Sequence, residues 1–190
     1  MRHCHNLLNP ETEKYLQKYN RILTEMIRGM EEARLKDSIS YNFIVQMVPH
    51  HLAAIEMSEN LLAYCPIPAL KEIAEGIITE QTRGIGDMLE IEEECEACRN
   101  TPCQLNKFQG RINQIKQLMF FQMRHACADN NISCNFMREM IPHHMGAVRM
   151  SKAALEYEIC PGLVPILQSI ITSQEHGIMQ MRELMRKNCC

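Results

Sequence analysis

Two stretches of the sequence decide the fold: Met47-Val48-Pro49-His50-His51-Leu52-Ala53-Ala54-Ile55-Glu56-Met57 and Met140-Ile141-Pro142-His143-His144-Met145-Gly146-Ala147-Val148-Arg149-Met150. They lie 93 residues apart, and this offset aligns residues 41–89 with residues 134–182 without a gap. Twenty-one of these 49 aligned pairs are identical. The chain therefore contains two copies of one module, spanning about residues 10–94 and 103–187, with residues 95–103 as the joint.

Each module has the pattern of three helices. Apolar residues recur at spacings of three and four, which is the period of a helix with one buried face. The first helix is expected to begin at Asn9-Pro10, the second after Lys36-Asp37-Ser38, and the third after a turn at residues 65–68. No segment alternates with the period of a strand. We expect an all-α bundle, built as a single domain (residues 1–190) from two pseudo-symmetric three-helix repeats.

The composition is rich in sulfur. The chain has fifteen Met, ten Cys and no Trp, and its net charge of −3 excludes the basic surface typical of nucleic-acid binding. No apolar run is long enough to cross a membrane, and residues 1–6 lack the apolar core of a secretory signal. The sequence therefore predicts a soluble, cytoplasmic protein without nucleic-acid or membrane partners, with mostly reduced cysteines and with a homodimer as one option.

Polar side chains interrupt the apolar seam at one level of each repeat. Counting residues outward from the helix turns, at about 1.5 Å per residue, places thioether, imidazole and amide groups within about one helical turn of each other. Neighbouring Met residues and one His extend the layer. The candidate metal ligands are Met26, Met47, His50, His51, Met57 and Gln81 in the first repeat and Met119, Met140, His143, His144, Met150 and Gln174 in the second, with Met30, Met123 and His176 as further candidates.

The chemistry of this layer favours a soft metal. Thioether sulfur and neutral imidazole suit Cu(I) and, by extension, Ag(I), whereas Mg²⁺ and Ca²⁺ prefer oxygen ligands. His50 and His51 are adjacent, so their side chains diverge by about 100° around the helix and need not hold the same ion. Gly84 and Gly177 on the third-helix seam permit a close approach or leave space for a guest. The alternative is that the same residues are ordinary core.

A second candidate metal site lies at the joint. Cys95, Cys98 and Cys103 form a C-x2-C-x4-C run that could hold Zn²⁺ or Cu(I), with reduced surface thiols as the alternative. A fourth ligand would come from residues distant in the sequence, the candidates being His3, Cys4, His5, Cys189 and Cys190. The other cysteines are expected to be buried apolar residues near helix ends: Cys65, Cys127, Cys134 and Cys160.

The two Met-x-Pro-His-His stretches resemble the hallmark of the ferritin-like family catalogued as domain of unknown function 305. That family follows each Met-Ile-Pro-His-His-x-x-Ala-x-x-Met helix with a Gln-x-x-Glu-Ile-x-x-Met helix, which residues 81–88 and 174–181 match. The resemblance implies a ferritin-like four-helix core with the first helix of each repeat added to it. It also implies copper binding through Met and His, as in some members. The family's Glu is replaced here by Gly84 and Gly177.

Three functions follow as alternatives. The first is binding of Cu(I) or Ag(I) for metal buffering or tolerance, with copper(I) as the expected ion and zinc as an option at the cysteines. The second is a ferritin-like redox enzyme with a di-metal site, which the missing glutamates disfavour together with iron. The third is a structural or partner-binding bundle without metal. We identify no catalytic residue, because no nucleophile–base pair or phosphate-binding loop is present.

Overall fold

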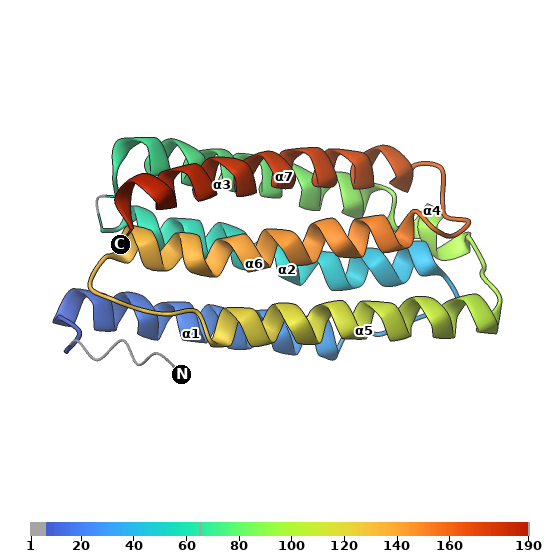
Figure 1. Cartoon of the computed structure of the whole chain (residues 1–190). Coiled ribbons are helices and arrows are strands. Elements are labelled where there is room, and N and C mark those ends of the chain that lie inside the picture. The colour runs from blue at the N-terminus through green and yellow to red at the C-terminus, as the bar shows by residue number, and fades with distance from the viewer. Residues whose placement is uncertain (1–6, 65, 190) are drawn as a thin grey trace.

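The structure is a computed structural model that describes residues 7–64 and 66–189. Within these ranges it contains seven helices and no strand, which confirms the predicted all-α bundle (Figure 1). No helix there is both apolar enough and long enough to cross a membrane. The helices are α1 (Pro10–Glu31), α2 (Ile39–Leu62), α3 (Pro68–Glu90), α4 (Glu92–Ala97), α5 (Pro102–Arg124), α6 (Ile132–Ala154) and α7 (Leu163–Asn188).

Four of the six long helices, α1, α2, α5 and α6, begin at a side-chain cap. The Asn9 side chain accepts a hydrogen bond from the Thr12 amide at 2.8 Å, directly before Pro10. Ser38 caps α2 in the same way, and Thr101 forms a capping box with Gln104 at the start of α5. Each cap satisfies backbone N–H groups that have no partner inside the helix. The predicted starts of α1, α2 and α3 are confirmed.

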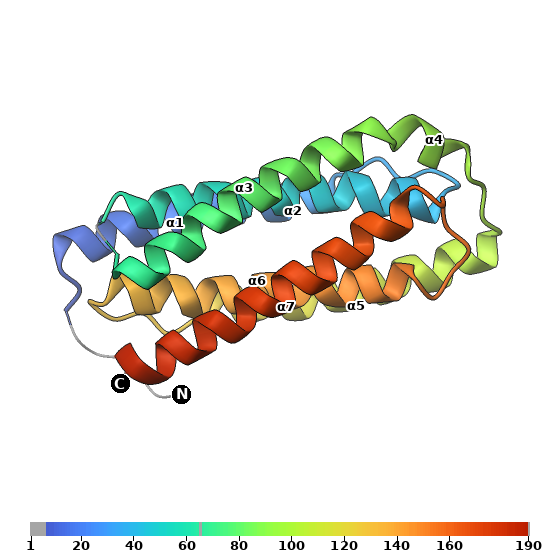
Figure 2. The ribbon, with the colours of Figure 1, turned by 90° about the horizontal axis from the view of Figure 1, so that it is seen from above.

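The six long helices form three layers of two (Figure 1). Helices α2 and α6 lie in the middle layer and contact each other, α1 and α5 cover one side, and α3 and α7 cover the other (Figure 2). Sixteen of the 24 residues of α2 and sixteen of the 23 of α6 are buried, against five of the 23 of α3. A helix buried on several sides is one that packs at the centre of a fold. Both His-His pairs are therefore in the most enclosed part of the molecule.

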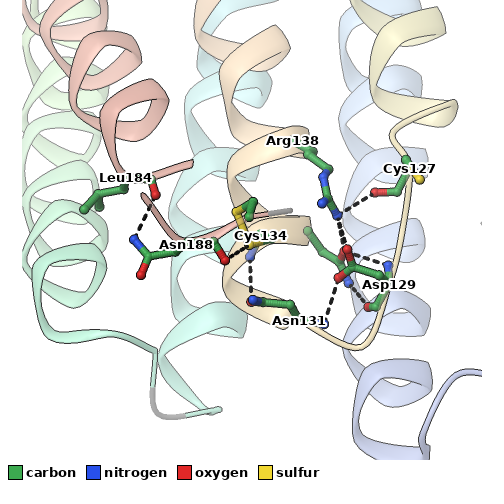
Figure 3. The surroundings of a disulfide bond; sticks show 9 residues. Cys127, Asp129, Asn131, Cys134, Arg138, Leu184 and Asn188 are labelled. Atoms are coloured by element: carbon green, nitrogen blue, oxygen red, sulfur yellow. Dashed lines mark hydrogen bonds and ion pairs between the residues drawn. A yellow bond between two sulfur atoms is a disulfide. The ribbon is translucent and has the colours of Figure 1, made fainter. Parts of the chain in front are cut away.

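A disulfide corrects the prediction for the cysteines. Cys134 at the start of α6 is bonded to Cys189 at the end of α7, with 5.8 Å between their Cα atoms (Figure 3). The adjoining loop is held by Arg138, whose guanidinium donates to an Asp129 carboxylate oxygen at 2.8 Å. The expectation of Cys134 as a plain apolar residue was wrong, because the chain's last turn returns to the start of α6. Four other described cysteines are free: Cys95, Cys98, Cys103 and Cys160. Cys127 is exposed rather than buried, and Cys65 lies outside the described residues.

Candidate metal centre

Two histidines from different repeats meet at the centre of the bundle. The imidazole rings of His50 on α2 and His143 on α6 are stacked, with 3.6 Å between their centroids and 26° between their planes. The His50 Nε2 atom lies 3.2 Å from the His143 carbonyl oxygen, and the His143 Nε2 atom lies 3.0 Å from the His50 carbonyl oxygen. Both residues are fully buried. Each repeat therefore supplies one half of a reciprocal contact.

These contacts assign the proton on each ring. A carbonyl oxygen only accepts hydrogen bonds, so Nε2 of both His50 and His143 carries the hydrogen. Burial, and the neighbouring histidines in the case of His50, lower the pKa of His50 well below its ordinary value, and burial lowers that of His143 to about 4. Both rings are therefore neutral at pH 7, and Nδ1 of each holds a free lone pair. Neither Nδ1 atom has a hydrogen-bond partner.

The second histidine of each pair points to the α3–α7 layer. The rings of His51 and His144 lie 6.0 Å and 5.9 Å from those of His50 and His143, at angles of 52° and 53°. A Cβ atom at Gly84 would lie 3.2 Å from the His51 ring, and one at Gly177 would lie 3.3 Å from the His144 ring. The predicted divergence of adjacent histidines and the predicted close approach at the two glycines are thus both observed.

Burial also keeps the outer histidines neutral. It lowers the pKa of His51 to about 3 and that of His144 well below its ordinary value, in both cases with a smaller contribution from His143. Their Nδ1 atoms are buried and have no partner either. The layer thus contains four neutral imidazoles, each with an unpaired nitrogen.

Two glutamines complete the polar part of the layer. Gln81 and Gln174 are 3% and 1% exposed, and Oε1 of Gln81 and both polar side-chain atoms of Gln174 lack partners. Both line a cavity of about 20 Å³ between α3 and α7 together with His51. Counting residues from the turns therefore placed Gln81 correctly beside the His-His pair.

A wider cleft of about 500 Å³ opens between the same two helices and reaches His144 and Gly177. Solvent therefore approaches the histidines from the side of the α3–α7 layer. His176 is exposed and lines this cleft, rather than joining the buried layer.

The predicted methionines all lie in the core. Met119 packs its sulfur against α6 at Gly146, about one helical turn from His143. The interior that holds the histidines is thus rich in sulfur, while the role of each thioether as a ligand stays a prediction. The buried set, none more than 2% exposed, is Met26, Met30, Met47, Met57, Met119, Met123, Met140 and Met150.

These donors fit a soft ion better than a hard one. In the described part of the chain, no three His, Cys, Asp or Glu side chains are arranged to hold a metal ion. A site at the histidine layer would therefore have to be completed by thioether sulfur or amide oxygen. The orphaned Nδ1 atoms of His50 and His143 provide the nitrogen donors for such a set, and imidazole with thioether suits Cu(I).

The predicted cysteine run is only partly brought together. Cys103 is exposed at the start of α5, whereas the Cys95 and Cys98 thiols contact Cys160 from the α6–α7 loop. Cys189 is in the disulfide and is not a free ligand. The other proposed fourth ligands lie outside the described residues: His3, Cys4, His5 and Cys190.

Two features of the centre were missed by the sequence interpretation. Levels were counted within each repeat, so the stacking of His50 on His143 across the repeats was not foreseen. The available signal was that equivalent residues of a two-fold arrangement meet when they lie on the axis. The participation of Cys160 had no such signal, since it lies more than 60 residues from Cys95.

Comparisons with known proteins agree with this architecture. A crystal structure of a DUF305 fragment from Deinococcus radiodurans superposes with a TM-score of 0.56 at 18% sequence identity, over 78% of this chain and 96% of that one. At this identity the likeness shows the fold alone. No curated protein matches the chain. The family described as "Domain of unknown function (DUF305)" matches residues 16–92 and 40–185. With both repeats covered, the chain belongs to the DUF305 family.

Proposed function

We propose that this protein binds a soft monovalent metal ion, Cu(I) or Ag(I), at the histidine layer and serves in metal buffering or tolerance. One observation carries the proposal: the Nδ1 atoms of His50 and His143 are lone-pair donors with no partner in the interior. An unpaired polar atom in an apolar interior costs about 1–3 kcal/mol. A bound ion would remove that penalty at several atoms at once.

The surroundings favour a soft ion over iron, magnesium or calcium. The buried core is rich in thioether and aliphatic groups, and the one buried Asp or Glu side chain among the described residues, Glu139, accepts a hydrogen bond from the Tyr15 hydroxyl at 2.5 Å. Ferritin-like di-metal enzymes require several carboxylates, so the redox-enzyme alternative lacks its ligands. Neutral imidazoles together with a single positive charge also require less charge compensation than a divalent ion.

The α3–α7 cleft supplies a route for the ion. Glu72 and Glu80 line the cleft whose inner end reaches His144, as does Glu183, which is paired with Lys187 at 2.7 Å. Acidic side chains at a cleft mouth raise the local concentration of cations. We infer that an ion enters here, meets His144 or His51 first, and is passed to the buried nitrogens, where the enclosing helices exclude water.

The test is an anaerobic Cu(I) titration of the full-length protein against a competing chelator. Free thiols also bind Cu(I), so the titration is made on a variant in which Cys95, Cys98, Cys103 and Cys160 are replaced by Ala. One class of tight sites is expected to remain. Replacing His50 and His143 by Gln in that background should weaken it at least about tenfold, which corresponds to about 1.4 kcal/mol.

Two controls keep the test decisive. His125 is exposed and outside the layer, so His125→Gln should leave the affinity unchanged. Two-dimensional nitrogen NMR of the unsubstituted histidines should show Cu(I) shifting the Nδ1 resonances of His50 and His143. Unchanged affinity in the double variant, with unshifted Nδ1 signals, would favour a metal-free structural bundle and refute the proposal.

The cytoplasmic location and the homodimer stay predictions from the sequence. A disulfide such as Cys134–Cys189 is more typical of an oxidising compartment than of the cytosol. Metal buffering by the histidine layer requires neither location, because its donors are neutral imidazole, thioether and amide groups.

A further inference from the structure

Three free cysteines meet at the end of the bundle where the two repeats join. The thiols of Cys95, at the end of α4, and of Cys98, directly after it, each contact the Cys160 thiol on the α6–α7 loop. Cys95 and Cys160 are fully buried, and Cys98 is half-buried. The Cys160 Sγ atom also donates to Glu94 Oε1 at 3.5 Å. None of the three thiols is in a disulfide in this structure.

The start of α2 holds the two cysteine segments in place. The Ser38 hydroxyl donates to the Cys95 carbonyl at 2.5 Å, and the Cys160 amide donates to the Ser40 hydroxyl at 2.8 Å. The Asn100 side chain adds a direct link, donating to the Glu158 carbonyl at 2.9 Å. The segments around residues 95–100 and 158–160 are thus fixed relative to each other.

The environment of the cluster distinguishes the three thiols. Burial and the neighbouring Cys160 raise the pKa of both Cys95 and Cys98, so these groups are protonated thiols at neutral pH. Only Cys98 is open enough to meet a reagent from solvent. Cys160 is the shared neighbour of the other two and is therefore placed to displace a group attached to Cys98.

We propose that Cys98 and Cys160 form a reversible disulfide that fastens the inter-repeat joint to the α6–α7 loop, with a low-molecular-weight disulfide as the oxidant. Cys98 loses its proton to solvent, and its thiolate attacks one sulfur of the oxidant, whose S–S bond breaks and releases a small thiolate that takes up a proton. Cys160 then passes its proton to the Glu94 carboxylate and attacks the Cys98 sulfur, releasing the second small thiol, which takes up that proton. Two protein thiols are oxidised, and one small disulfide is reduced to two thiols.

Cys103 provides a matched control within the same joint. It is free and exposed, whereas the thiol contacts within residues 7–64 and 66–189 join Cys95 and Cys98 to Cys160. It forms only a mixed disulfide, while an intramolecular pair gains from the high effective concentration of the second thiol. The Cys98–Cys160 bond should therefore form at an oxidant-to-thiol ratio at least about tenfold lower than modification of Cys103.

The experiment equilibrates the full-length protein with oxidised and reduced glutathione, blocks free thiols with an alkylating reagent, and maps tryptic peptides by mass spectrometry. Cleavage after Arg99 separates Cys103 from Cys95 and Cys98. The expected product joins the Cys98 peptide to the Cys160 peptide. Fragmentation between Cys95 and Cys98 then locates the bond, and Cys103 should still be alkylated at that ratio.

Variants separate the proposed order of attack from simple proximity. Cys160→Ser should abolish the cross-link and trap glutathione on Cys98, while Cys103→Ser should leave the cross-link unchanged. Glu94→Gln should slow closure without removing it. The proposal is overturned if Cys95 bonds to Cys98 with Cys160 left alkylated, or if the cluster stays reduced under conditions that modify Cys103.

Discussion

The two repeats agree where their histidines meet and differ where the middle layer packs against α1 and α5. At the centre the reciprocal Nε2–carbonyl distances are 3.2 and 3.0 Å, and the ring separations within the two His-His pairs are 6.0 and 5.9 Å. In contrast, Gln46 on α2 corresponds to Glu139 on α6, and the two have different partners. The symmetric residues contact their own equivalents, so a change in one repeat alters the partner of the other.

Positions away from this contact are paired with non-equivalent residues. Glu139 accepts from the Tyr15 hydroxyl, whereas Gln46 accepts from the Lys116 ammonium at 2.8 Å. Both pairs join the two repeats, and the Tyr15 and Lys116 partners align with Phe108 and Leu23, which cannot replace them. The fold therefore tolerates divergence where α1 and α5 pack, and it retains identity where the histidines meet.

The largest expected effect tests the symmetric centre in metal-free protein. The four buried histidines have lowered pKa values, so below pH 6.5 the unfolded chain binds protons that the native state excludes. The free energy of unfolding therefore decreases as the pH decreases. Between pH 7 and 5 each histidine lowers the free energy of unfolding by about 2 kcal/mol, and the four together lower it by about 8 kcal/mol. The raised pKa of Glu139 offsets about 2–3 kcal/mol of this. Urea unfolding between pH 7 and 5 should show a net loss of about 5 kcal/mol.

Single variants show whether both repeats contribute to this acid limb. His51→Gln and His144→Gln should each reduce the loss of stability between pH 7 and 5 by the same amount, the contribution of one histidine, about 2 kcal/mol. A flattened limb in only one of the two core variants would contradict the equivalence of the two His-His pairs.

A smaller effect, at alkaline pH, tests the position where Glu139 of the second repeat replaces Gln46 of the first. Burial raises the pKa of Glu139 to about 8, so the native state retains a proton that the unfolded state releases above pH 4.5. Its contribution is present at low pH and is lost as pH rises through 8, about 3 kcal/mol between pH 6 and 9. Glu139→Gln installs the residue of the first repeat and should remove this loss, as measured by urea unfolding at each pH.

The reverse substitution is the matched control. Gln46→Glu places the carboxylate beside Lys116, whose ammonium would hold it in the charged form. No comparable alkaline loss is expected from it. An alkaline limb unchanged by Glu139→Gln would show that Glu139 is not the titrating group.

The helices were predictable because their signals are local. The caps at Asn9 and Ser38 and the three-four spacing of apolar residues specify where each helix begins and which face is buried. The layer order depends on how the two repeats pack together. Spacing within one repeat does not specify that packing.

The site was predictable to the same extent. Counting residues from the turn between α2 and α3 predicted that His51 and Gln81 lie close together, because that one turn joins the two helices. The stack of His50 on His143 joins two repeats and arises from the axis between them. The proton positions required hydrogen-bond partners that only the three-dimensional structure supplies. Without these, the free Nδ1 atoms could not be identified.

The smallest expected effects are on the stability of variants at Gly84 and Gly177, the glycines that contact the outer histidines His51 and His144. An Ala at Gly84 or Gly177 gains about 1 kcal/mol of helix propensity. Each added methyl lies 3.2–3.3 Å from an imidazole, so the ring must give by a few tenths of an ångström. His51 adjoins a cavity of about 20 Å³, whereas His144 reaches a cleft of about 500 Å³ and has room to move.

We therefore expect Gly177→Ala to stabilise the protein by about 0.5 kcal/mol and Gly84→Ala to be nearly neutral, as measured by urea unfolding at pH 7. Gly86→Ala is the control, since no atom lies within 4 Å of its added Cβ, and it should show the full gain of about 1 kcal/mol. Equal gains in the free energy of unfolding for all three variants would mean that both imidazole rings move aside without cost. The packing beside His51 and His144 would then impose no difference between the two repeats.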